Sequence, residues 1–147
     1  MSETEGDPLA VALFSEILAV EGLIRARLGN ALPKGMELSH FMVLNHLALI
    51  GRERSPVQLA RAFHLTKGAM TNTLGKLEWA GWVHIRPDWD DARRKKVAIS
   101  PAGIAARDAA IAAMGPVIAD ALASVEDEKV RATLPVLRAL RQNLIRG

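Results

Sequence analysis

The stretch "SPVQLARAFHLTKGAMTNTLGKLEWAG" (55–81) restricts the fold of this chain more than any other segment, because it contains two helix starts in quick succession. Ser55 can cap the first helix, Pro56 suits its first position, and Gln58 lies where a capping box has its reciprocal acceptor. Thr66 can cap the second helix, and Gly81 can end it. Because only two residues separate these short helices, the stretch predicts a helix-turn-helix.

The second helix of this pair has two different faces on a helical wheel. The face expected in the core consists of Met70, Thr73, Leu74 and Leu77. The opposite face consists of Gly68, Asn72, Gly75 and Lys76, with Thr71 at its flank. A glycine on an exposed helical face costs about 1 kcal/mol relative to alanine, so two of them indicate a close approach of the backbone to a groove. The alternative is an ordinary surface helix with poor helix formers.

The polar side chains of this second face are suited to reading a DNA duplex. Asn72 can form a pair of hydrogen bonds with adenine, and Thr71 can meet the methyl group of thymine. Lys67 and Lys76 can reach phosphates or guanine. The face therefore has the composition expected of a helix that enters the major groove.

Two short alternating segments follow, "WVHIR" (82–86) and "KVAIS" (96–100), and they flank a loop as the strands of a hairpin do. Their apolar residues of one parity are Val83, Ile85, Val97 and Ile99. By the same parity, the other face carries His84, Arg86, Arg94 and Lys96. The sequence thus predicts a β-hairpin with one apolar and one basic face.

The loop region "PDWDDARRKK" (87–96) places three acids directly before four bases. The bases suit a hairpin tip that lies along the DNA backbone and inserts an arginine into a narrow minor groove. Carboxylates would repel phosphates there, so they need a different role. We expect Asp91 to pair with Arg93 across the turn and to orient it, while Asp88 and Asp90 accept backbone N–H bonds. The alternative is a charged hairpin that is simply solvated.

An N-terminal helix is expected to begin at Asp7, which can cap it, and at Pro8, which suits its first position. Its apolar residues recur at helical spacing, and Leu18 and Leu23 make the apolar face wider than a small core requires. This width indicates a partner helix. Ser39 is expected to cap the next helix, which ends near residue 51.

Ser100 and Pro101 predict another helix start directly after the hairpin. Pro116 and Pro135 fall inside the last two helical patterns and are expected to kink or break them. The chain is therefore predicted to be mainly α with a small β-hairpin, in the order α-α-α-α-β-β-α-α.

The net charge of +3 conceals an uneven distribution. Residues 52–96 hold ten Lys and Arg against five acids, whereas the rest of the chain holds nine against eleven. A basic middle third suits a polyanionic partner. The absence of Cys excludes disulfides and thiol chemistry. The acidic start "MSETEGDPLA" and the lack of an apolar run near 18 residues predict a soluble cytoplasmic protein that does not enter a membrane.

The stretches "ELSHFMVLNHL", "SPVQLARAFHLTKGAMTNTLGKLEWAGWVHIRPDWDDARRKKVAIS" and "PAG" follow one another nearly without gaps. Over residues 37–103 the chain resembles the MarR (multiple antibiotic resistance regulator) family of winged helix-turn-helix transcription factors. The family's wing signature is present here as Asp91, Arg93, Ile99, Ser100 and Gly103. The resemblance implies one domain over 1–147, with a DNA-binding winged helix at 37–100 and dimerisation helices at 8–30 and 101–146.

The resemblance also implies a homodimer that binds double-stranded DNA at a pseudo-palindromic operator and represses transcription. The resemblance further implies relief of repression when a small-molecule effector enters a cleft between the dimerisation and DNA-binding parts, and the sequence leaves the identity of the effector and its contact residues open. The half-sites of such a dimer are expected about 10 bp apart. Asn72 stands where many members carry Arg, so the operator preference cannot be carried over. The residues expected to contact DNA are Ser55, Thr66, Lys67, Gly68, Thr71, Asn72, Lys76, Arg86, Arg93, Arg94 and Lys96.

Other site types have weaker support in the sequence. His40 and His46 lie away from a common face of one predicted helix, and neither Cys nor an ordered acidic cluster joins them, so no metal site is predicted. Trp79 and Trp82 are interpreted as packing between the helix and the hairpin rather than as a ligand cage. Trp89 is interpreted as covering the hairpin, and stacking on a ligand or a sugar is the alternative.

A catalytic function also has little support. The chain has no nucleophile with a base at useful spacing, no phosphate-binding glycine loop, and no paired carboxylates outside the hairpin. We therefore predict no enzyme, no catalytic residue and no cofactor. A winged helix that binds only protein is the remaining alternative, and the basic hairpin with the glycine-bearing helix favours DNA over it.

Overall fold

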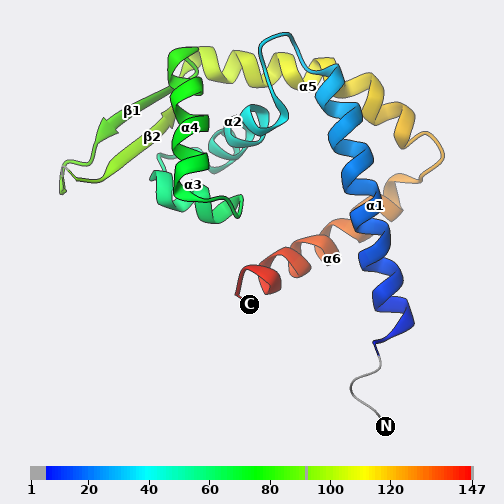
Figure 1. Ribbon diagram of the computed structural model, residues 1–147. Helices are drawn as coiled ribbons and strands as arrows, with labels where there is room; N and C mark the ends of the chain where they lie inside the picture. The colour runs from blue at the N-terminus through cyan, green and yellow to red at the C-terminus, as the bar shows by residue number, and fades with distance from the viewer. Residues whose placement is uncertain (1–5, 92, 147) are drawn as a thin grey trace. The chain divides into compact units, whose positions relative to one another are not determined.

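The computed structural model describes residues 6–91 and 93–146 (Figure 1). Its elements are α1 (Pro8–Ala31), α2 (Leu38–Ile50), α3 (Pro56–Ala62), α4 (Lys67–Trp79), β1 (Val83–Pro87), β2 (Lys95–Ile99), α5 (Pro101–Ala121) and α6 (Asp127–Arg146). This order confirms the predicted fold class. The chain divides into two compact units between Met114 and Gly115, inside α5.

The first unit has one apolar core, to which α2, α3, α4 and both strands contribute. Its fully buried side chains include Val43, Leu44, Leu47, Leu59, Met70, Leu74, Leu77, Val83 and Val97. Burying a side chain of this kind stabilises the fold by about 1.5–3 kcal/mol. The core therefore fixes α4 and the hairpin to one common body.

Side-chain caps begin most of the helices where the sequence predicted them. Asp7 accepts a hydrogen bond from the N–H of Leu9, and Thr66 accepts one from the N–H of Ala69. The predicted capping box at the start of α3 is also present. These polar contacts are local in sequence, which is why the pattern could reveal them.

The predicted cap of α2 is wrong. Ser39 lies inside the helix, and Glu37 is its cap. The Glu37 side chain accepts from the backbone N–H of His40, and Nδ1 of His40 accepts from the backbone N–H of Glu37 at 3.1 Å. This arrangement is a capping box in which histidine replaces the usual Glu or Gln. The sequence pattern missed it for that reason.

The hairpin forms where it was predicted, with the bounds of each strand shifted by one residue, and Arg94, expected on its basic face, lies in the loop before β2. Val83 pairs with Ile99 and Ile85 with Val97 in an antiparallel ladder. A further bridge ties it to the segment between α2 and α3, because the backbone N–H and C=O of Arg54 both bond Val97, at 3.0 and 2.7 Å. Strand β2 thus bonds β1 and, at Val97, also bonds the segment between α2 and α3.

The end of α4, the start of β1 and the start of α5 meet at Ser100. Its hydroxyl donates to the C=O of Gly81 at 2.6 Å and accepts from the N–H of Gly103 at 2.9 Å. A Cβ at Gly103 would lie 2.0 Å from the carbonyl oxygen of Trp82. Ser100 is therefore required here for its hydroxyl cap, and Gly103 is required because a Cβ at this position would clash with the backbone.

The outer helices differ from the expectations in several respects. Both α5 and α6 continue through their internal prolines, so Pro116 and Pro135 do not break them. Of the helices that the structure describes, α5 has the length and apolar composition of a membrane-spanning helix, contrary to the prediction that no such run exists. Gly103, Ala110 and Met114 of α5 are buried, whereas most of the helix is not.

Candidate nucleic-acid interface

The face of α4 that was predicted to read DNA is exposed. Met70, Leu74 and Leu77 are buried in the core, so the side chains on the opposite side of the helix point away from the body. A Cβ at Gly68 or Gly75 would have no neighbour within 4 Å. Packing within the protein therefore gives no reason for glycine at these positions. The set on this face comprises Lys67, Gly68, Thr71, Asn72, Gly75 and Lys76, all exposed.

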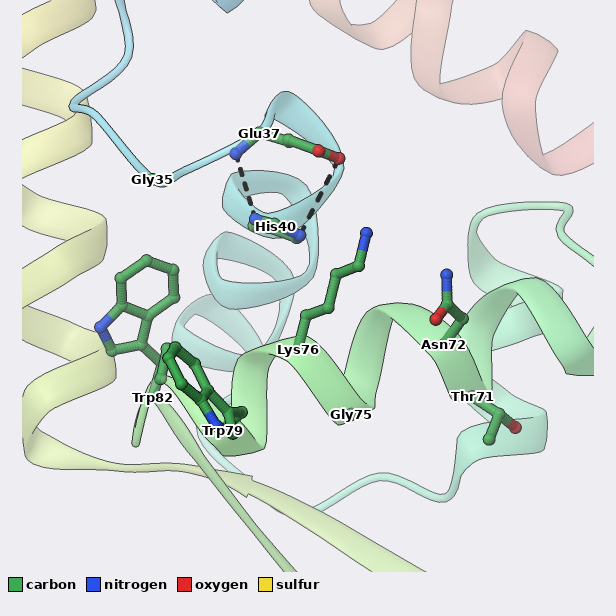
Figure 2. Close-up of a pocket in the computed structure, with 10 residues that line it drawn as sticks. Gly35, Glu37, His40, Thr71, Asn72, Gly75, Lys76, Trp79 and Trp82 are labelled. Atoms are coloured by element: carbon green, nitrogen blue, oxygen red, sulfur yellow. Dashed lines mark hydrogen bonds and ion pairs between the residues drawn. The ribbon is translucent and has the colours of Figure 1, made fainter.

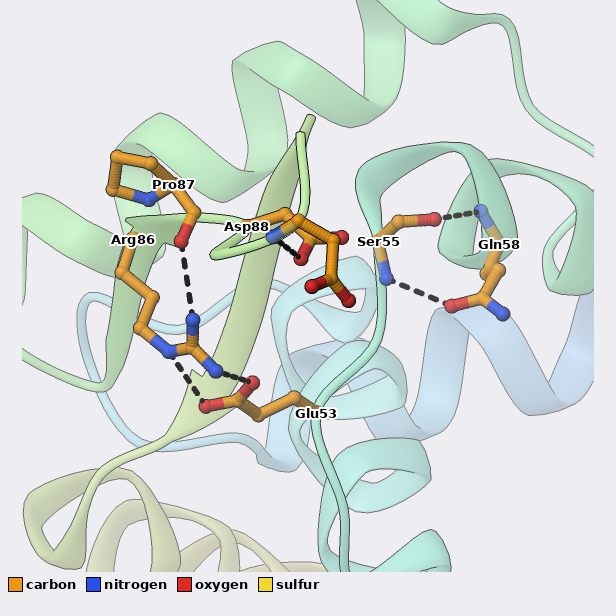
Figure 3. Close-up of polar contacts among 7 residues, drawn as sticks. Glu53, Ser55, Gln58, Arg86, Pro87 and Asp88 are labelled. Carbon is orange, nitrogen blue, oxygen red and sulfur yellow. Dashed lines mark hydrogen bonds and ion pairs between the residues drawn. The ribbon is translucent and has the colours of Figure 1, made fainter. Parts of the chain in front are cut away.

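The two predicted phosphate contacts at helix starts also serve as caps. The Ser55 hydroxyl accepts from the N–H of Gln58 at 3.1 Å, while the Gln58 side chain accepts from the Ser55 N–H (Figure 3). The Thr66 hydroxyl accepts from the N–H of Ala69 at 3.1 Å. A hydroxyl that accepts in this way keeps its O–H as a donor. Both could therefore cap a helix and bond a phosphate together.

The loop of the hairpin, residues 88–94, has the predicted polar support. Oδ1 of Asp91 accepts from the backbone N–H of Arg93 at 3.0 Å and from its Nε at 3.2 Å. These two bonds lower the pKa of the Asp91 carboxyl below its usual range, and Arg94 adds to the effect. Asp88 accepts from the N–H of Asp90 at 3.0 Å, as expected. The predicted acceptor role of Asp90 stays a prediction.

The bases of this loop differ in how they are held. The Arg93 side chain is 92% exposed although Asp91 contacts it, and Arg94 lies 3.7 Å from the same carboxylate. Lys96 is half-buried and pairs with Arg86 in the ladder. Arg93 and Arg94 thus both present exposed charge at the tip.

Arg86 has a partner that the sequence did not indicate. Its Nε and Nη2 donate to the two carboxylate oxygens of Glu53, at 3.0 and 2.5 Å, and its Nη1 donates to the C=O of Pro87 at 3.1 Å (Figure 3). All three guanidinium nitrogens are engaged within the protein. Glu53 lies in the α2–α3 connection, so the pair joins the hairpin to the body.

The interpretation of two tryptophans is wrong. Trp79 is 92% exposed at the end of α4, and Trp89 is 88% exposed in the hairpin loop, so neither packs between helix and hairpin or covers it. Trp82 is half-buried against the core, as expected. The Arg86 guanidinium lies over the Trp89 ring, 5.5 Å from its centroid.

A hollow of about 560 Å³ lies between the start of α2 and the exposed face of α4. The indoles of Trp79 and Trp82 border it, and the Lys76 side chain extends toward Glu37 and His40 (Figure 2). Thr71, Asn72 and Gly75 also line it. A molecule held in this hollow would therefore touch residues of the predicted DNA-reading face.

His40 is a structural residue in this arrangement. Burial lowers its pKa, opposed by Glu37 and reinforced by Lys76, which favours the neutral ring that accepts from the Glu37 N–H. The edge of its ring also meets Trp82 at 6.5 Å between centroids. In the part of the chain that the structure describes, no group of three metal-ligating side chains comes together.

Comparison with known proteins gives a consistent result. The sequence model of the MarR family matches residues 34–94. Over these residues the chain is similar to the MarR family of transcription regulators. Members of this family are DNA-binding transcription regulators and not enzymes, in agreement with the prediction.

Solved structures share the fold over nearly the whole chain. BldR from Sulfolobus solfataricus matches with a TM-score of 0.79 at 23% identity, covering 100% of both chains. A mutant MarR from E. coli in complex with operator DNA matches at 0.74 and 22% identity, over 92% of this chain and 99% of that one. The organohalide-sensing regulator RdhR in its 2,4-dichlorophenol-bound form matches at 0.74 and 21% identity, over 99% and 86%.

Sequence reasoning predicted the exposed polar face of α4 and the basic hairpin but missed the Glu53–Arg86 pair. Glu53 and Arg86 are 33 residues apart in sequence, so no local spacing pointed to the contact. The hollow was missed for the same reason, because it combines two helices that only the core brings together. The acidic Glu53 and the basic residues predicted for the hairpin gave a general sign of an ion pair, but they did not identify Arg86 as the partner.

Proposed function

We propose that the chain is a homodimeric, sequence-specific repressor that acts in the cytoplasm on chromosomal DNA and is released by a small-molecule effector. The observation that carries the proposal is the joint exposure of the glycine-bearing face of α4 and of the Arg93 side chain on a single buried core. The first suits a major groove and the second the adjacent minor groove.

The contacts divide by chemistry. The cap hydroxyls of Ser55 and Thr66, together with Lys67, are placed for phosphates, which position the protein without reading sequence. Thr71, Asn72 and Lys76 contact the edges of the bases. Gly68 and Gly75 allow the helix backbone to approach the DNA closely. Arg93 and Arg94 enter or border the minor groove, with Lys96 behind them. Asp91 orients Arg93 through the contacts described above.

A dimer is supported by the apolar surface of the outer helices. No residue of α1 is buried, although its large apolar side chains include Leu9, Leu13, Phe14, Leu18, Leu23 and Ile24. The separate unit that contains α6 likewise exposes Leu134, Leu137 and Leu144. Apolar surface of this extent is typical of a subunit interface. A two-fold pair would place two copies of α4 about 10 bp apart on a pseudo-palindrome.

The test is the salt dependence of binding to a duplex selected from a random pool. A dimer that touches about 8–10 phosphates should show a slope of log affinity against log salt near −7 to −9. Lys67→Ala should make the slope shallower, whereas Lys34→Ala, outside the interface, should leave it unchanged. A slope near zero would favour the protein-binding alternative, and a monomer by sedimentation would contradict the dimer.

The hollow beside α4 is the proposed effector site. Its two indoles suit a small planar molecule, and the Lys76 ammonium suits an acidic group on it. Because Asn72 and Lys76 line the hollow, a bound effector would compete with DNA for the same side chains. A thermal-shift screen of small aromatic acids should find a ligand that raises the Tm and releases DNA. Trp82→Ala should abolish both effects, and a ligand unaffected by it would bind elsewhere.

A further inference from the structure

Trp89 is the most conspicuous residue that the proposed contacts leave without a role. It lies in the hairpin loop four residues before Arg93 and is 88% exposed. A tryptophan can bury a larger area than most side chains, so exposing it at a loop tip forgoes much apolar stabilisation. Its ring is nevertheless held, because the Arg86 guanidinium lies over one face. The other face is open.

A chain of contacts leads from this ring back to the body. Arg86 is clamped by both carboxylate oxygens of Glu53, and Glu53 precedes Arg54, whose backbone is bridged to β2 at Val97 (Figure 3). A paired, planar guanidinium has a fixed orientation, and it restricts the orientation of an aromatic ring that packs on it. The tip is thereby supported by a side chain anchored outside the hairpin.

We propose that Trp89 is a DNA contact whose free indole face packs on deoxyribose in the wall of the minor groove, beside Arg93. Arg86 and Glu53 are positioning residues that hold the indole, and Arg86 does not touch DNA. This inference rests on the proposed function, and it replaces the predicted DNA contact of Arg86 with an indirect role.

The chemistry favours sugar over phosphate as the partner. Asp88 and Asp90 flank the ring in sequence, and their carboxylates would repel phosphates brought close to this part of the loop. Deoxyribose is uncharged and presents C–H groups, which suit the electron-rich face of an indole. Its contact adds apolar affinity without counterion release, whereas Arg93 contributes through charge.

The experiment measures affinity and salt slope on the duplex that the wild-type protein selects from a random pool. Trp89→Ala should weaken binding about tenfold, as loss of one aromatic contact to nucleic acid does, with an unchanged slope. Trp89→Phe should recover most of the affinity. Arg93→Ala, present in both subunits of the dimer, should instead lower the magnitude of the slope by about two. Urea unfolding of each variant checks that the fold is retained.

The positioning role is tested by a double-mutant cycle. Arg86→Ala and Glu53→Gln should each weaken binding without changing the slope, and neither should add to the loss in a Trp89→Ala background. A decrease of about two in the magnitude of the slope of Arg86→Ala, one for each subunit, would mean that Arg86 binds phosphate directly, which overturns its assignment.

Two other results are distinguishable. If Trp89→Ala binds as tightly as the wild type, the indole has no DNA contact and the inference fails while the proposed function stands. If the wild-type protein prefers no duplex, the proposed function fails together with the inference.

Discussion

Helix α4 and the hairpin loop, described at residues 88–91, 93 and 94, are held in place by different means. Three side chains of α4 are buried in the apolar core, so its position depends on packing and is insensitive to salt. The loop depends on polar contacts instead, chiefly the part-buried pair of Arg86 with Glu53 and the pair of Asp91 with the exposed Arg93. Exposed pairs of this kind contribute little to stability. The comparison indicates that packing in the core keeps the surface of α4 rigid, whereas polar contacts orient the charged side chains of the loop.

The largest expected effect tests the packing of α4. Leu77→Ala removes a fully buried side chain and should lower the free energy of unfolding by about 2–5 kcal/mol, because a cavity is left in the core. Urea denaturation measures the change, and Leu49→Ala, at a position 72% exposed, is the matched control. Equal effects of the two substitutions would mean that α4 is not held by the core.

A second substitution acts where α4 and the hairpin are joined. Gly103→Ala forces a Cβ toward the Trp82 carbonyl and should destabilise the protein by about 1–3 kcal/mol or more, because backbone rather than a flexible side chain is in the way. Thermal unfolding would show a lower Tm. If the Tm is unchanged, the close approach of α5 to this carbonyl is not essential.

A pH titration should separate the two kinds of support. The pKa of His40 is lowered from 6.5 in the folded state, so the unfolded chain binds more protons below that pH and stability should fall from pH 7 to 5. The pKa of Asp91 is lowered from 3.8, so its contribution persists at pH 5 and is lost only as the pH falls through the lowered value. In His40→Gln the decrease in the free energy of unfolding between pH 7 and 5, measured by urea denaturation, should be smaller than in the wild type.

At Gly75 the expected effects on stability and binding have opposite signs. Gly75→Ala meets no neighbour and should raise the free energy of unfolding by about 0.5–1 kcal/mol. The added methyl group lies on the face proposed to meet DNA, so affinity for the selected duplex should fall by roughly tenfold, or about 1.4 kcal/mol. Anisotropy titration and urea unfolding on the same preparation measure both. A variant that is stabilised and binds normally would remove the reason given for glycine.

The smallest change in stability is expected in the loop. Asp91→Asn removes the charge that holds the Arg93 guanidinium but leaves an acceptor for the backbone N–H. Because the site is exposed, urea unfolding should show no measurable change, while affinity for DNA should fall through loss of orientation. A clear loss of stability would instead place the loop among the structural supports of the fold.

Much of the fold was predictable because its signals are local. The caps at Asp7, Ser55 and Thr66 and the alternation in the two strands depend on residues a few positions apart, and all were confirmed. The cap of α2 was missed because histidine serves in place of Gln or Glu. The exposure of the α4 face followed from the helical period, whereas the DNA contacts assigned to it remain predictions.

The amino-acid sequence by itself determined the order of the elements, the two faces of α4 and the opposed charges of the hairpin loop, since each follows from spacing along the chain. Only the tertiary structure decided that Glu53 takes Arg86, that Trp89 and Trp79 are exposed, and that α2 and α4 enclose a hollow. The physical reason is that these contacts join residues brought together by burial of the common core, and no local period records which distant side chains will then meet.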